Sequence, residues 1–421
     1  MEIIKKPKGT MDIYGLDGKK YAYIESLIHE LCEKYNYSFV KTPSFESSEL
    51  FHRGVGETTD IVTKETYDFV DRGDRKMTLR PEGTAGVARM YIENKLDNDP
   101  NQPMKFYYIS PAFRYERPQS GRLREHTQFG VEVLGSDSPL VDGEVISLAV
   151  NFYRLLGLKN LKVKLNSLGD NESRIKYKEA LINHFKPSIN DLCEDCQNRI
   201  NKNPLRILDC KVDIDNPLMK SAPKTIDYLN EESKKRFEEV KNILDDLDIS
   251  YEVDTNLVRG LDYYNHTVFE IQADVEGFGA QSTLCGGGRY NGLIKELGGS
   301  DVPAMGFGIG IERLLLALDS IGIDLLSDKR MDLYIINLCT DKKIPLLLAN
   351  DLRMSGYTVD LDFMDKSLKG QFKNVERLNP KYITVIGDEE IKERKLKIKD
   401  NDTKEEVEIE MQDIISFFEG V

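Results

Sequence analysis

An arginine set among strand-forming residues is the feature that most constrains this chain. Residues 257–270 place Arg259 directly after an apolar pair, follow it with Gly260 and two tyrosines, and then alternate as a strand does. Arginine is seldom buried without an anionic partner, and its planar guanidinium holds a carboxylate or phosphate through two parallel hydrogen bonds. The stretch therefore predicts either a structural ion pair or an anion-binding site.

The composition is that of a globular protein with more than one domain. The chain has 421 residues, of which 40% are hydrophobic and 31% are charged, which is enough for two or three domains. No apolar run approaches the ~20 residues that a membrane helix needs, and the N-terminus lacks the pattern of a secretory signal. We therefore expect a cytoplasmic protein with no membrane span. The net charge of −14 disfavours nucleic-acid binding overall, although a local basic groove can still provide it.

The periodicity of the chain changes along its length. Residues 1–325 mix helix and strand patterns, and residues 170–250 within them are charged and mostly helical, as an insertion would be. Residues 320–329 are typical of a linker. Residues 331–421 then alternate strand, helix and strand, which predicts a small α/β domain.

Several strands and turns are expected in the first part. A strand is predicted for residues 105–109, with a new segment starting at Pro111. Strands at 113–116 and 128–134 are predicted to form a hairpin around a basic loop, residues 117–122, with Arg124 close to it. A further short strand is expected at 258–261.

Alternating glycines precede the last helix of this part. Gly306, Gly308 and Gly310 lie on a predicted strand that enters a helix at residues 311–318. The spacing does not match the dinucleotide-binding fingerprint, because residue 311 is isoleucine and no acid-bearing strand follows at the required distance. Glycines on one face of a strand instead let a flat ring or a phosphate approach the backbone.

Three of the six cysteines are spaced like metal ligands. Cys193 and Cys196 form a C-x-x-C pair, and Cys210 follows fourteen residues later. This is part of a zinc pattern, and His184 is the nearest candidate for a fourth ligand. Two interpretations stay open, which are a structural zinc ion and reduced cysteines without metal.

The reactive side chains are mainly arginines. No arrangement of serine, cysteine and histidine typical of a nucleophilic site is found, and Arg114, Arg122, Arg259 and Arg313 each lie close to glycine, acidic or aromatic residues. Enzymes of phosphoryl or nucleotidyl transfer work largely by positioning substrates and neutralising phosphate charge. Mg²⁺ commonly shares that work.

These segments together resemble the class II aminoacyl-tRNA synthetases. Residues 113–116 with their loop, and residues 306–313, look like motifs 2 and 3 of that class, and residues 20–43 are similar to its dimer-forming motif 1. Residues 257–264, 285–290 and 78–84 resemble peptides of the histidyl-tRNA synthetase family. The resemblance implies an α+β fold: a class II core of mostly antiparallel sheet flanked by helices at 1–325, its helical insertion at 170–250, and a C-terminal α/β anticodon-binding domain at 331–421.

The resemblance also implies an amino-acid pocket. Glu82 and Thr84 would hold the α-amino group of L-histidine, since an ammonium group needs an acid and neutral acceptors. Glu132 and Tyr264 would bond the two imidazole nitrogens. The implied histidine-binding residues are Glu82, Thr84, Gln128, Glu132, Arg259, Tyr263 and Tyr264.

The implied ATP site uses the arginines. Arg114 would contact the α-phosphate, Arg313 the γ-phosphate and Arg122 the terminal phosphates, while Arg259 would stabilise charge between the α-phosphate and the substrate carboxylate. Glu116 would bond the adenine amino group. His126 stands where the family usually stacks phenylalanine on adenine. Imidazole can also stack, and its protonation would make nucleotide affinity depend on pH.

For residues 331–421 the resemblance implies a tRNA partner. Lys366, Lys369, Lys373 and Arg377 recur at near-helical spacing and form a basic stripe that would contact the backbone of histidine tRNA. The whole resemblance predicts a homodimeric, ATP-dependent histidine–tRNA ligase that uses Mg²⁺. The alternative is a paralogue of the synthetase that serves as a regulatory subunit of ATP phosphoribosyltransferase in histidine biosynthesis. Such paralogues generally lack the anticodon domain and lose motif residues that are present here.

Overall fold

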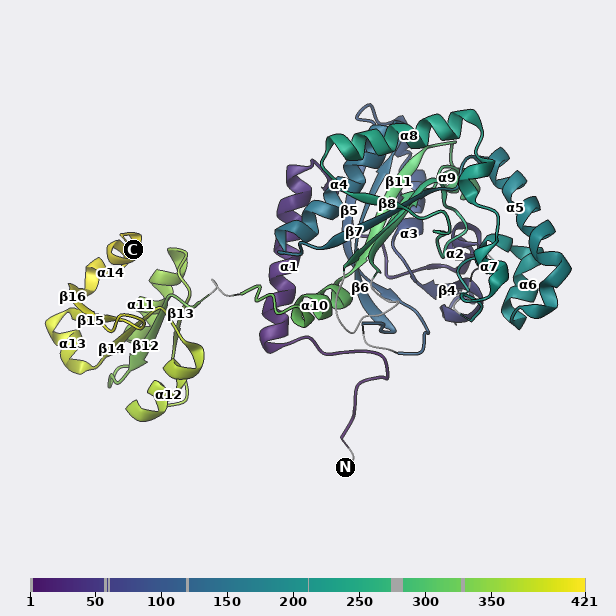
Figure 1. Ribbon diagram of the computed structural model, residues 1–421. Helices are drawn as coiled ribbons and strands as arrows, with labels where there is room; N and C mark the ends of the chain where they lie inside the picture. Colours follow the sequence, from purple (N-terminus) through teal and green to yellow (C-terminus); the bar gives the residue numbers. More distant parts are fainter. Residues whose placement is uncertain are drawn as a thin grey trace. The chain divides into compact units, whose positions relative to one another are not determined.

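The structure of the protein is a computed structural model that describes residues 3–56, 59, 61–118, 121–210, 212–273, 283–326 and 330–420. Gln119 of the basic loop, part of the predicted linker and Val421 lie outside the described residues. The chain divides into two compact units, Met1–Leu325 and Leu326–Val421, and each is described by itself (Figure 1).

A large sheet forms the centre of the first unit. Within the described residues it contains eight strands in the order β1-β5-β6-β11-β10-β9-β7-β8. Neighbouring strands are antiparallel except for β1 with β5 and β7 with β8. The expected α+β fold with a mostly antiparallel sheet is therefore confirmed. The strands are β1 (Ser38–Phe39), β5 (Met104–Phe113), β6 (Glu125–Leu134), β7 (Leu161–Ser167), β8 (Tyr251–Val253), β9 (Asn265–Ala273), β10 (Thr283–Arg289) and β11 (Ala304–Gly310).

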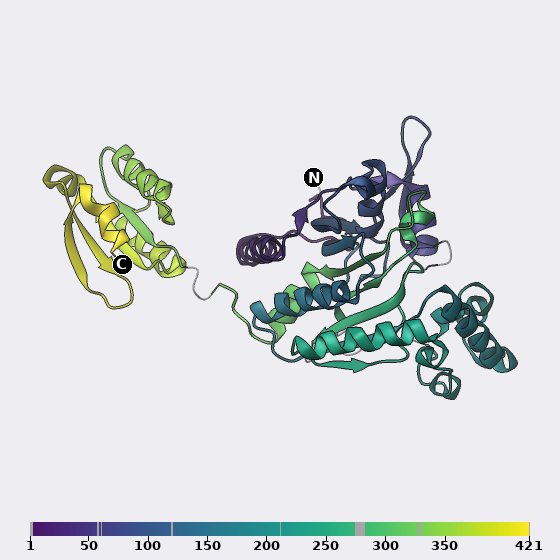
Figure 2. The same cartoon turned by 90° about the horizontal axis from the view of Figure 1, so that it is seen from above.

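One face of this sheet is apolar and covered by helices. Successive side chains of a strand point to opposite faces, and Phe129 and Val131 of β6 enter the same core as Phe269 and Ile271 of β9. Helices α1 (Gly15–Lys34), α4 (Pro139–Leu155), α8 (Glu231–Asp246) and α10 (Ile311–Ser320) bring apolar residues to that core. Helices α4 and α8 lie side by side (Figure 2).

The opposite face of the sheet holds polar and aromatic side chains. Gln128, Gly130 and Glu132 alternate with the core residues of β6 and so point to this second face. Helix α3 (Thr84–Glu93) packs apolar residues beside it, together with Phe106 and Tyr108 of β5. A small sheet in the order β2-β4-β3 and helices α2 (Ser48–Val55) and α9 (Leu293–Glu296) lie next to α3. Its strands are β2 (Phe45–Ser47), β3 (Tyr67–Val70) and β4 (Lys76–Leu79).

The segment between β7 and β8 is mostly helical. It contains α5 (Asn171–Phe185), α6 (Glu194–Lys202), α7 (Pro217–Lys220) and α8, joined by short 3₁₀ turns. Because β7 and β8 pair in parallel, they need a long connection rather than a tight turn. Apolar residues of α5 and α6 share one core with the segment that carries Arg259.

Two local predictions were wrong. Strand β5 continues through Pro111 to Phe113, so that no separate strand forms at 113–116. Proline is tolerated there because the pairing of β5 with β1 ends at Tyr107, so β1 needs no N–H from Pro111, and Arg80 Nε donates to the Pro111 carbonyl. Residues 258–261 also form no strand, since Leu257 and Val258 pack into the core of the helical insertion instead of along a neighbouring strand.

The second unit is the predicted strand–helix–strand domain. Its five described strands have the order β13-β12-β14-β15-β16, parallel for the first three and antiparallel afterwards. They are β12 (Leu333–Asn337), β13 (Val359–Leu361), β14 (Tyr382–Ile386), β15 (Lys395–Asp400) and β16 (Glu406–Glu410). The helices are α11 (Lys343–Met354), α12 (Leu368–Leu378), α13 (Asp388–Glu393) and α14 (Ile414–Glu419). Across the described parts of both units, no helix combines the length and apolar character that crossing a bilayer requires.

Candidate active site

Glycines on two strands make room for the polar side chains of the second face. In the register of the sheet, Gly306 of β11 is paired with Glu132 of β6. A Cβ at Gly306 would overlap the Glu132 carboxylate, and one at Gly308 would overlap the Gln128 amide. The alternating glycines therefore accommodate side chains of the protein itself, not only the ring or phosphate expected from the sequence.

Glu132 is the centre of a buried cluster of hydroxyl groups. Its carboxylate accepts hydrogen bonds from Thr84 Oγ1 at 2.7 Å, from the Tyr108 hydroxyl at 3.2 Å and from the Tyr290 hydroxyl at 2.5 Å. Burial raises the pKa of Glu132 to about 8, although these donors oppose the shift. The carboxyl group is thus poised to gain or lose a proton near neutral pH, which suits a partner whose own nitrogens can donate or accept.

Tyrosines complete the wall beside Glu132. Tyr263 and Tyr264, in the segment before β9, have ring centroids 4.7 Å apart, and Tyr263 packs edge-on against Tyr290 at 5.6 Å. Burial raises the pKa of Tyr264 to about 12, so that its hydroxyl stays protonated at physiological pH. The sequence predicted Tyr263 and Tyr264 but missed Tyr108 and Tyr290.

Glu82 lies just before helix α3, which borders this pocket, and its side chain caps the first turn. Its carboxylate accepts backbone hydrogen bonds from Thr84 at 2.7 Å and Ala85 at 2.9 Å, in the first turn of α3. Burial raises the pKa of Glu82. Gln128 Oε1 accepts a hydrogen bond from the backbone N–H of Gly83 at 2.9 Å, so the same turn is held from β6. Glu82, Thr84, Gln128 and Glu132 thus lie together in the structure.

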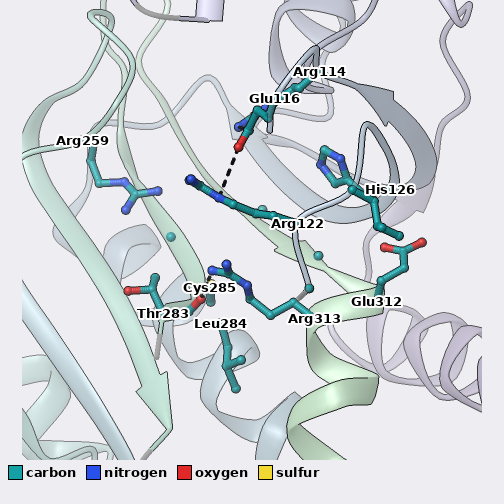
Figure 3. A pocket seen from close by; sticks show the side chains of 15 residues that line it. Arg114, Glu116, Arg122, His126, Arg259, Thr283, Leu284, Cys285, Glu312 and Arg313 are labelled. Atoms are coloured by element: carbon teal, nitrogen blue, oxygen red, sulfur yellow. Dashed lines mark hydrogen bonds and ion pairs between the residues drawn. The ribbon is translucent and has the colours of Figure 1, made fainter. Parts of the chain in front are cut away.

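The four predicted arginines line one cavity. Arg114, Arg122, Arg259 and Arg313 border a space of about 680 Å³, its open mouth included, although they lie as far apart in the chain as β5 and α10. Arg122, Arg259 and Arg313 point toward one another across it (Figure 3). The carboxylates on its described wall are those of Glu116 and Glu312. The guanidinium groups outnumber them, so the cavity favours an anion.

Each arginine is oriented by a protein partner. Arg259 forms an ion pair with Glu270 of β9, and a Cβ at Gly286 would overlap its guanidinium. Arg313 Nη1 donates to the Thr283 carbonyl at 3.0 Å, and Arg114 Nε donates to the Pro81 carbonyl at 2.9 Å. Arg122 lies 3.3 Å from the Glu116 carboxylate. The sequence left the partner of Arg259 open between a structural ion pair and a ligand, and the structure places a carboxylate of the chain there.

Arg259 links the cavity to the tyrosine pocket. Its guanidinium carbon lies 6.0 Å from the centroid of the Tyr264 ring, while the same side chain lines the arginine cavity. An anion in the cavity and a small molecule beside Tyr264 would therefore meet at Arg259. This arrangement suits a reaction that joins a phosphate group to a second substrate.

The comparisons with known proteins agree with this geometry. A family model described as histidyl-tRNA synthetase matches residues 9–314, and an anticodon binding domain model matches residues 335–420. A histidine–tRNA ligase of Anoxybacillus flavithermus is 52% identical over 99% of this chain and 98% of its own, and that of Listeria monocytogenes is 51% identical over 96% and 95%. The solved apo histidyl-tRNA synthetase of S. aureus superposes with a TM-score of 0.83, at 44% identity, over 99% of this chain and 100% of its own.

The chain belongs to the histidyl-tRNA synthetase family.

Other residues singled out from the sequence lie elsewhere. Lys366, Lys369, Lys373 and Arg377 belong to the second unit, on α12 or just before it, and all four are exposed. Cys193, Cys196 and Cys210 come together in the insertion, but His184 does not join them. Its Nε2 contacts the Leu218 carbonyl instead, so His184 as a fourth ligand was wrong.

His126 corrects a further expectation. Burial lowers its pKa to about 3, and the charges of Arg114, Arg313 and Arg122 act in the same direction. The imidazole is therefore neutral throughout the physiological range. The expected pH-dependent nucleotide affinity does not follow, and a neutral ring is free to stack as phenylalanine does in the family.

The glycine at 286 gives a test of how Arg259 is held. In Gly286→Ala the new methyl group would displace a flexible guanidinium rather than backbone, so we expect the protein to fold. We expect ATP–pyrophosphate exchange to fall by about 10²-fold, because one preorganised donor is displaced. Gly18→Ala, on α1 and clear of close contacts, is the matched control and should keep wild-type exchange. Wild-type exchange in Gly286→Ala would contradict the fixed position of Arg259.

The neutral state of His126 gives a second test. A group whose pKa is lowered to about 3 does not change charge between pH 5.5 and 8. We therefore expect the pH profile of the KM for ATP to have the same shape in the wild type and in His126→Phe. A rise in the wild-type profile below pH 7 that is missing from the variant would show that the imidazole titrates there.

Proposed function

We propose that this enzyme activates L-histidine with ATP and transfers it to the 3′ end of histidine tRNA. Histidine and ATP give histidyl-adenylate and pyrophosphate, and the adenylate and tRNA then give histidyl-tRNA and AMP. The observation that carries the proposal is that Arg259 borders both the arginine cavity and the pocket of Glu132 and Tyr264. The full-length similarity to histidine–tRNA ligases supports it.

The pocket of Glu132 is the proposed histidine site. Glu132 and Tyr264 would bond the two imidazole nitrogens, with Tyr263 and Gln128 lining the pocket. The Glu82 carboxylate accepts two backbone hydrogen bonds at the start of α3. A carboxylate has about four acceptor positions, so together with Thr84 it would still accept hydrogen bonds from the substrate ammonium group. A site that bonds both ring nitrogens would reject side chains without them by ~10⁴ or more.

The arginine cavity is the proposed ATP site. Arg114 would contact the α-phosphate, Arg313 the γ-phosphate and Arg122 the terminal phosphates, with His126 stacked on adenine and Glu116 at its amino group. Glu116 lies 3.3 Å from Arg122, so the phosphates of ATP would compete with this carboxylate for that arginine. Bound Mg²⁺ would offset phosphate charge, and the carboxylates of the cavity are the hard oxygen ligands that it prefers.

Arg259 is the proposed centre of the activation step. The attacking carboxylate of histidine and the α-phosphate are both anionic, and negative charge builds up on the phosphate oxygens as they react. A guanidinium fixed at this point neutralises both groups and holds them within reach. Its ion pair with Glu270 supports this role because it orients the guanidinium before substrates arrive.

The second unit is the proposed site for the tRNA anticodon region. Besides its four basic side chains, the described surface near α12 exposes Phe363, at 67% of its full exposure, and Phe372, at 40%. Exposed aromatic rings beside cations suit single-stranded RNA, whose bases stack on them. Cytoplasmic location belongs to the same proposal, since that is where tRNA is charged.

A homodimer is proposed from the segment that resembles motif 1. Within this segment Phe39 on β1 is 48% exposed, and just before it Leu16, near the start of α1, is 60% exposed and Tyr14, which precedes α1, is 79% exposed. A second copy covering them would bury this surface. Sedimentation of the purified chain measures the mass, and a monomer at micromolar concentration would count against the dimer.

Pyrophosphate exchange across the twenty amino acids tests the function itself. We expect exchange with L-histidine alone, and we expect Arg259→Ala to lower it by about 10²–10³-fold while the melting temperature stays within a few degrees. Glu270→Gln removes the ion pair but keeps the guanidinium, so it should retain more exchange than Arg259→Ala. Absence of exchange with every amino acid would favour the regulatory paralogue, which needs no activation step.

The basic stripe gives a separate test. In the double variant Lys369→Ala/Lys373→Ala we expect weaker binding of histidine tRNA and a salt dependence whose slope falls by about 1 for each phosphate that these lysines neutralise. Amino-acid activation should not change. Lys392→Ala/Lys397→Ala, which removes two other exposed lysines of this unit, is the charge-matched control. Equal weakening of binding in both variants would show a general charge effect without a defined stripe.

A further inference from the structure

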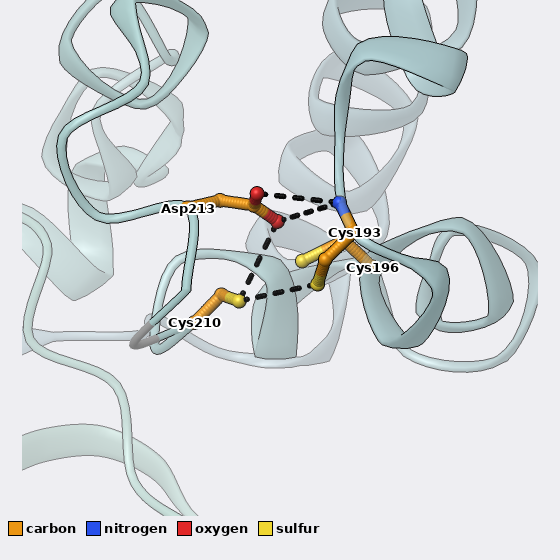
Figure 4. A group of neighbouring side chains, drawn as sticks. All are labelled: Cys193, Cys196, Cys210 and Asp213. Atoms are coloured by element: carbon orange, nitrogen blue, oxygen red, sulfur yellow. Dashed lines mark hydrogen bonds between the residues drawn. The ribbon is translucent and has the colours of Figure 1, made fainter.

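Four potential ligand side chains converge in the insertion, outside the site described above. The ligand atoms of Cys193, Cys196, Cys210 and Asp213 all lie within 4.8 Å of one another (Figure 4). Cys196, Cys210 and Asp213 are buried, and Cys193 is half-buried. Cys193 directly precedes α6, Cys196 lies in the first turn of that helix, and Cys210 and Asp213 follow it.

The cluster consists of two short ligand pairs, here called knuckles, and each pair has two residues between its ligands. Cys193-x-x-Cys196 is followed by Cys210-x-x-Asp213, so the second pair repeats the first with aspartate in place of the last cysteine. Structural zinc sites are commonly built from two such pairs. The fourth potential ligand is thus the carboxylate of Asp213, which is neither a cysteine nor a histidine.

The side chains are already arranged as ligands would be. The Sγ atoms of Cys193 and Cys210 are 3.6 Å apart, close to the edge of ~3.8 Å of a tetrahedron whose centre lies ~2.3 Å from each sulfur. The Asp213 carboxylate accepts a hydrogen bond from the Cys193 backbone N–H, at 3.0 Å to one oxygen and 3.2 Å to the other. That hydrogen bond fixes the carboxylate beside the sulfurs, as a supporting contact to a metal ligand does.

We propose that Cys193, Cys196, Cys210 and Asp213 bind one zinc ion. Three thiolates and one carboxylate form a closed set of four ligands, which is typical of a structural rather than a catalytic zinc site. A Cys193–Cys210 disulfide is the competing use of these sulfurs. It would leave Cys196 and Asp213 buried at the same point without a function, whereas a metal ion uses all four groups.

The ion would hold the part of the insertion that touches the Arg259 segment. Between the two knuckles, Arg206 Nη1 donates to the Arg259 carbonyl at 3.4 Å, and Asn203 Nδ2 donates to Asp262 at 2.6 Å. Closing the loop from Cys193 to Asp213 with a metal restricts the segment that carries Arg206 and Asn203. The zinc ion therefore acts as a structural support beneath the loop of Arg259.

Metal content of the full-length protein tests the proposal. We expect the wild type, purified without chelator and dialysed against metal-free buffer, to retain about one zinc ion per chain by mass spectrometry of the metal. Cys196→Ala should lose it, and Asp213→Asn should bind it more weakly. Cys32→Ala, which changes a buried cysteine of the other core, is the matched control and should keep one ion.

Cobalt substitution gives a second readout, and its main observation is made on the wild-type protein. Co²⁺ added to the chelator-treated wild type should give the thiolate charge-transfer and visible bands of a tetrahedral site, and those bands should be changed in Asp213→Asn. Wild-type protein that retains no zinc and gives no such bands would overturn the proposal. A Cys193–Cys210 disulfide found by peptide mapping of the native protein, or equal zinc content in the wild type and in Cys196→Ala, would do the same.

Discussion

The close packing of functional side chains against glycines of the central sheet is the constraint on which the rest of the site depends. Glu132, Gln128 and Arg259 each occupy space that a Cβ at Gly306, Gly308 or Gly286 would fill. The pleat places these glycines and the polar residues of β6 on the same face, because every second residue of a strand points the same way. The opposite face packs a continuous apolar core, which keeps the strands rigid and the glycines in register.

Electrostatics divides this face into two regions. Around Glu132 the charged form of a carboxyl group is disfavoured by burial, and hydroxyl groups rather than cations surround it. In the neighbouring cavity guanidinium groups outnumber carboxylates, and burial together with these positive charges holds the pKa of His126 low. Arg259 lies at the boundary, with Glu270 on one side and the Tyr264 ring on the other. One region therefore suits a small polar molecule and the other a polyanion.

Much of the fold and part of the site could be predicted from the sequence. Alternation and helical periodicity gave β11, α10 and the strands β12, β13 and β14 of the second unit, because those signals are local, but they did not give β15 and β16. Arg259 was found because a buried guanidinium needs a partner. Arg114, Arg122 and Arg313 were found because they lie close to glycine, acidic or aromatic residues in the sequence. Glu270, Tyr108 and Asp213 were missed, since each acts through a residue that is distant in sequence or outside the expected pattern. His184 was chosen for its nearness along the chain, which does not determine nearness in space.

The double use of Glu82 limits how the amino-acid preference of this fold can change. The same carboxylate accepts hydrogen bonds from the first backbone N–H groups of α3. It also lies at the pocket, beside Thr84 and Glu132. A substitution of Glu82 that changed the charge at this end of the pocket would also remove hydrogen bonds from the first turn of α3, which packs against the sheet. Redesign toward another side chain would therefore have to start from Tyr263 and Tyr264, whose rings contribute surface to the pocket but cap no helix.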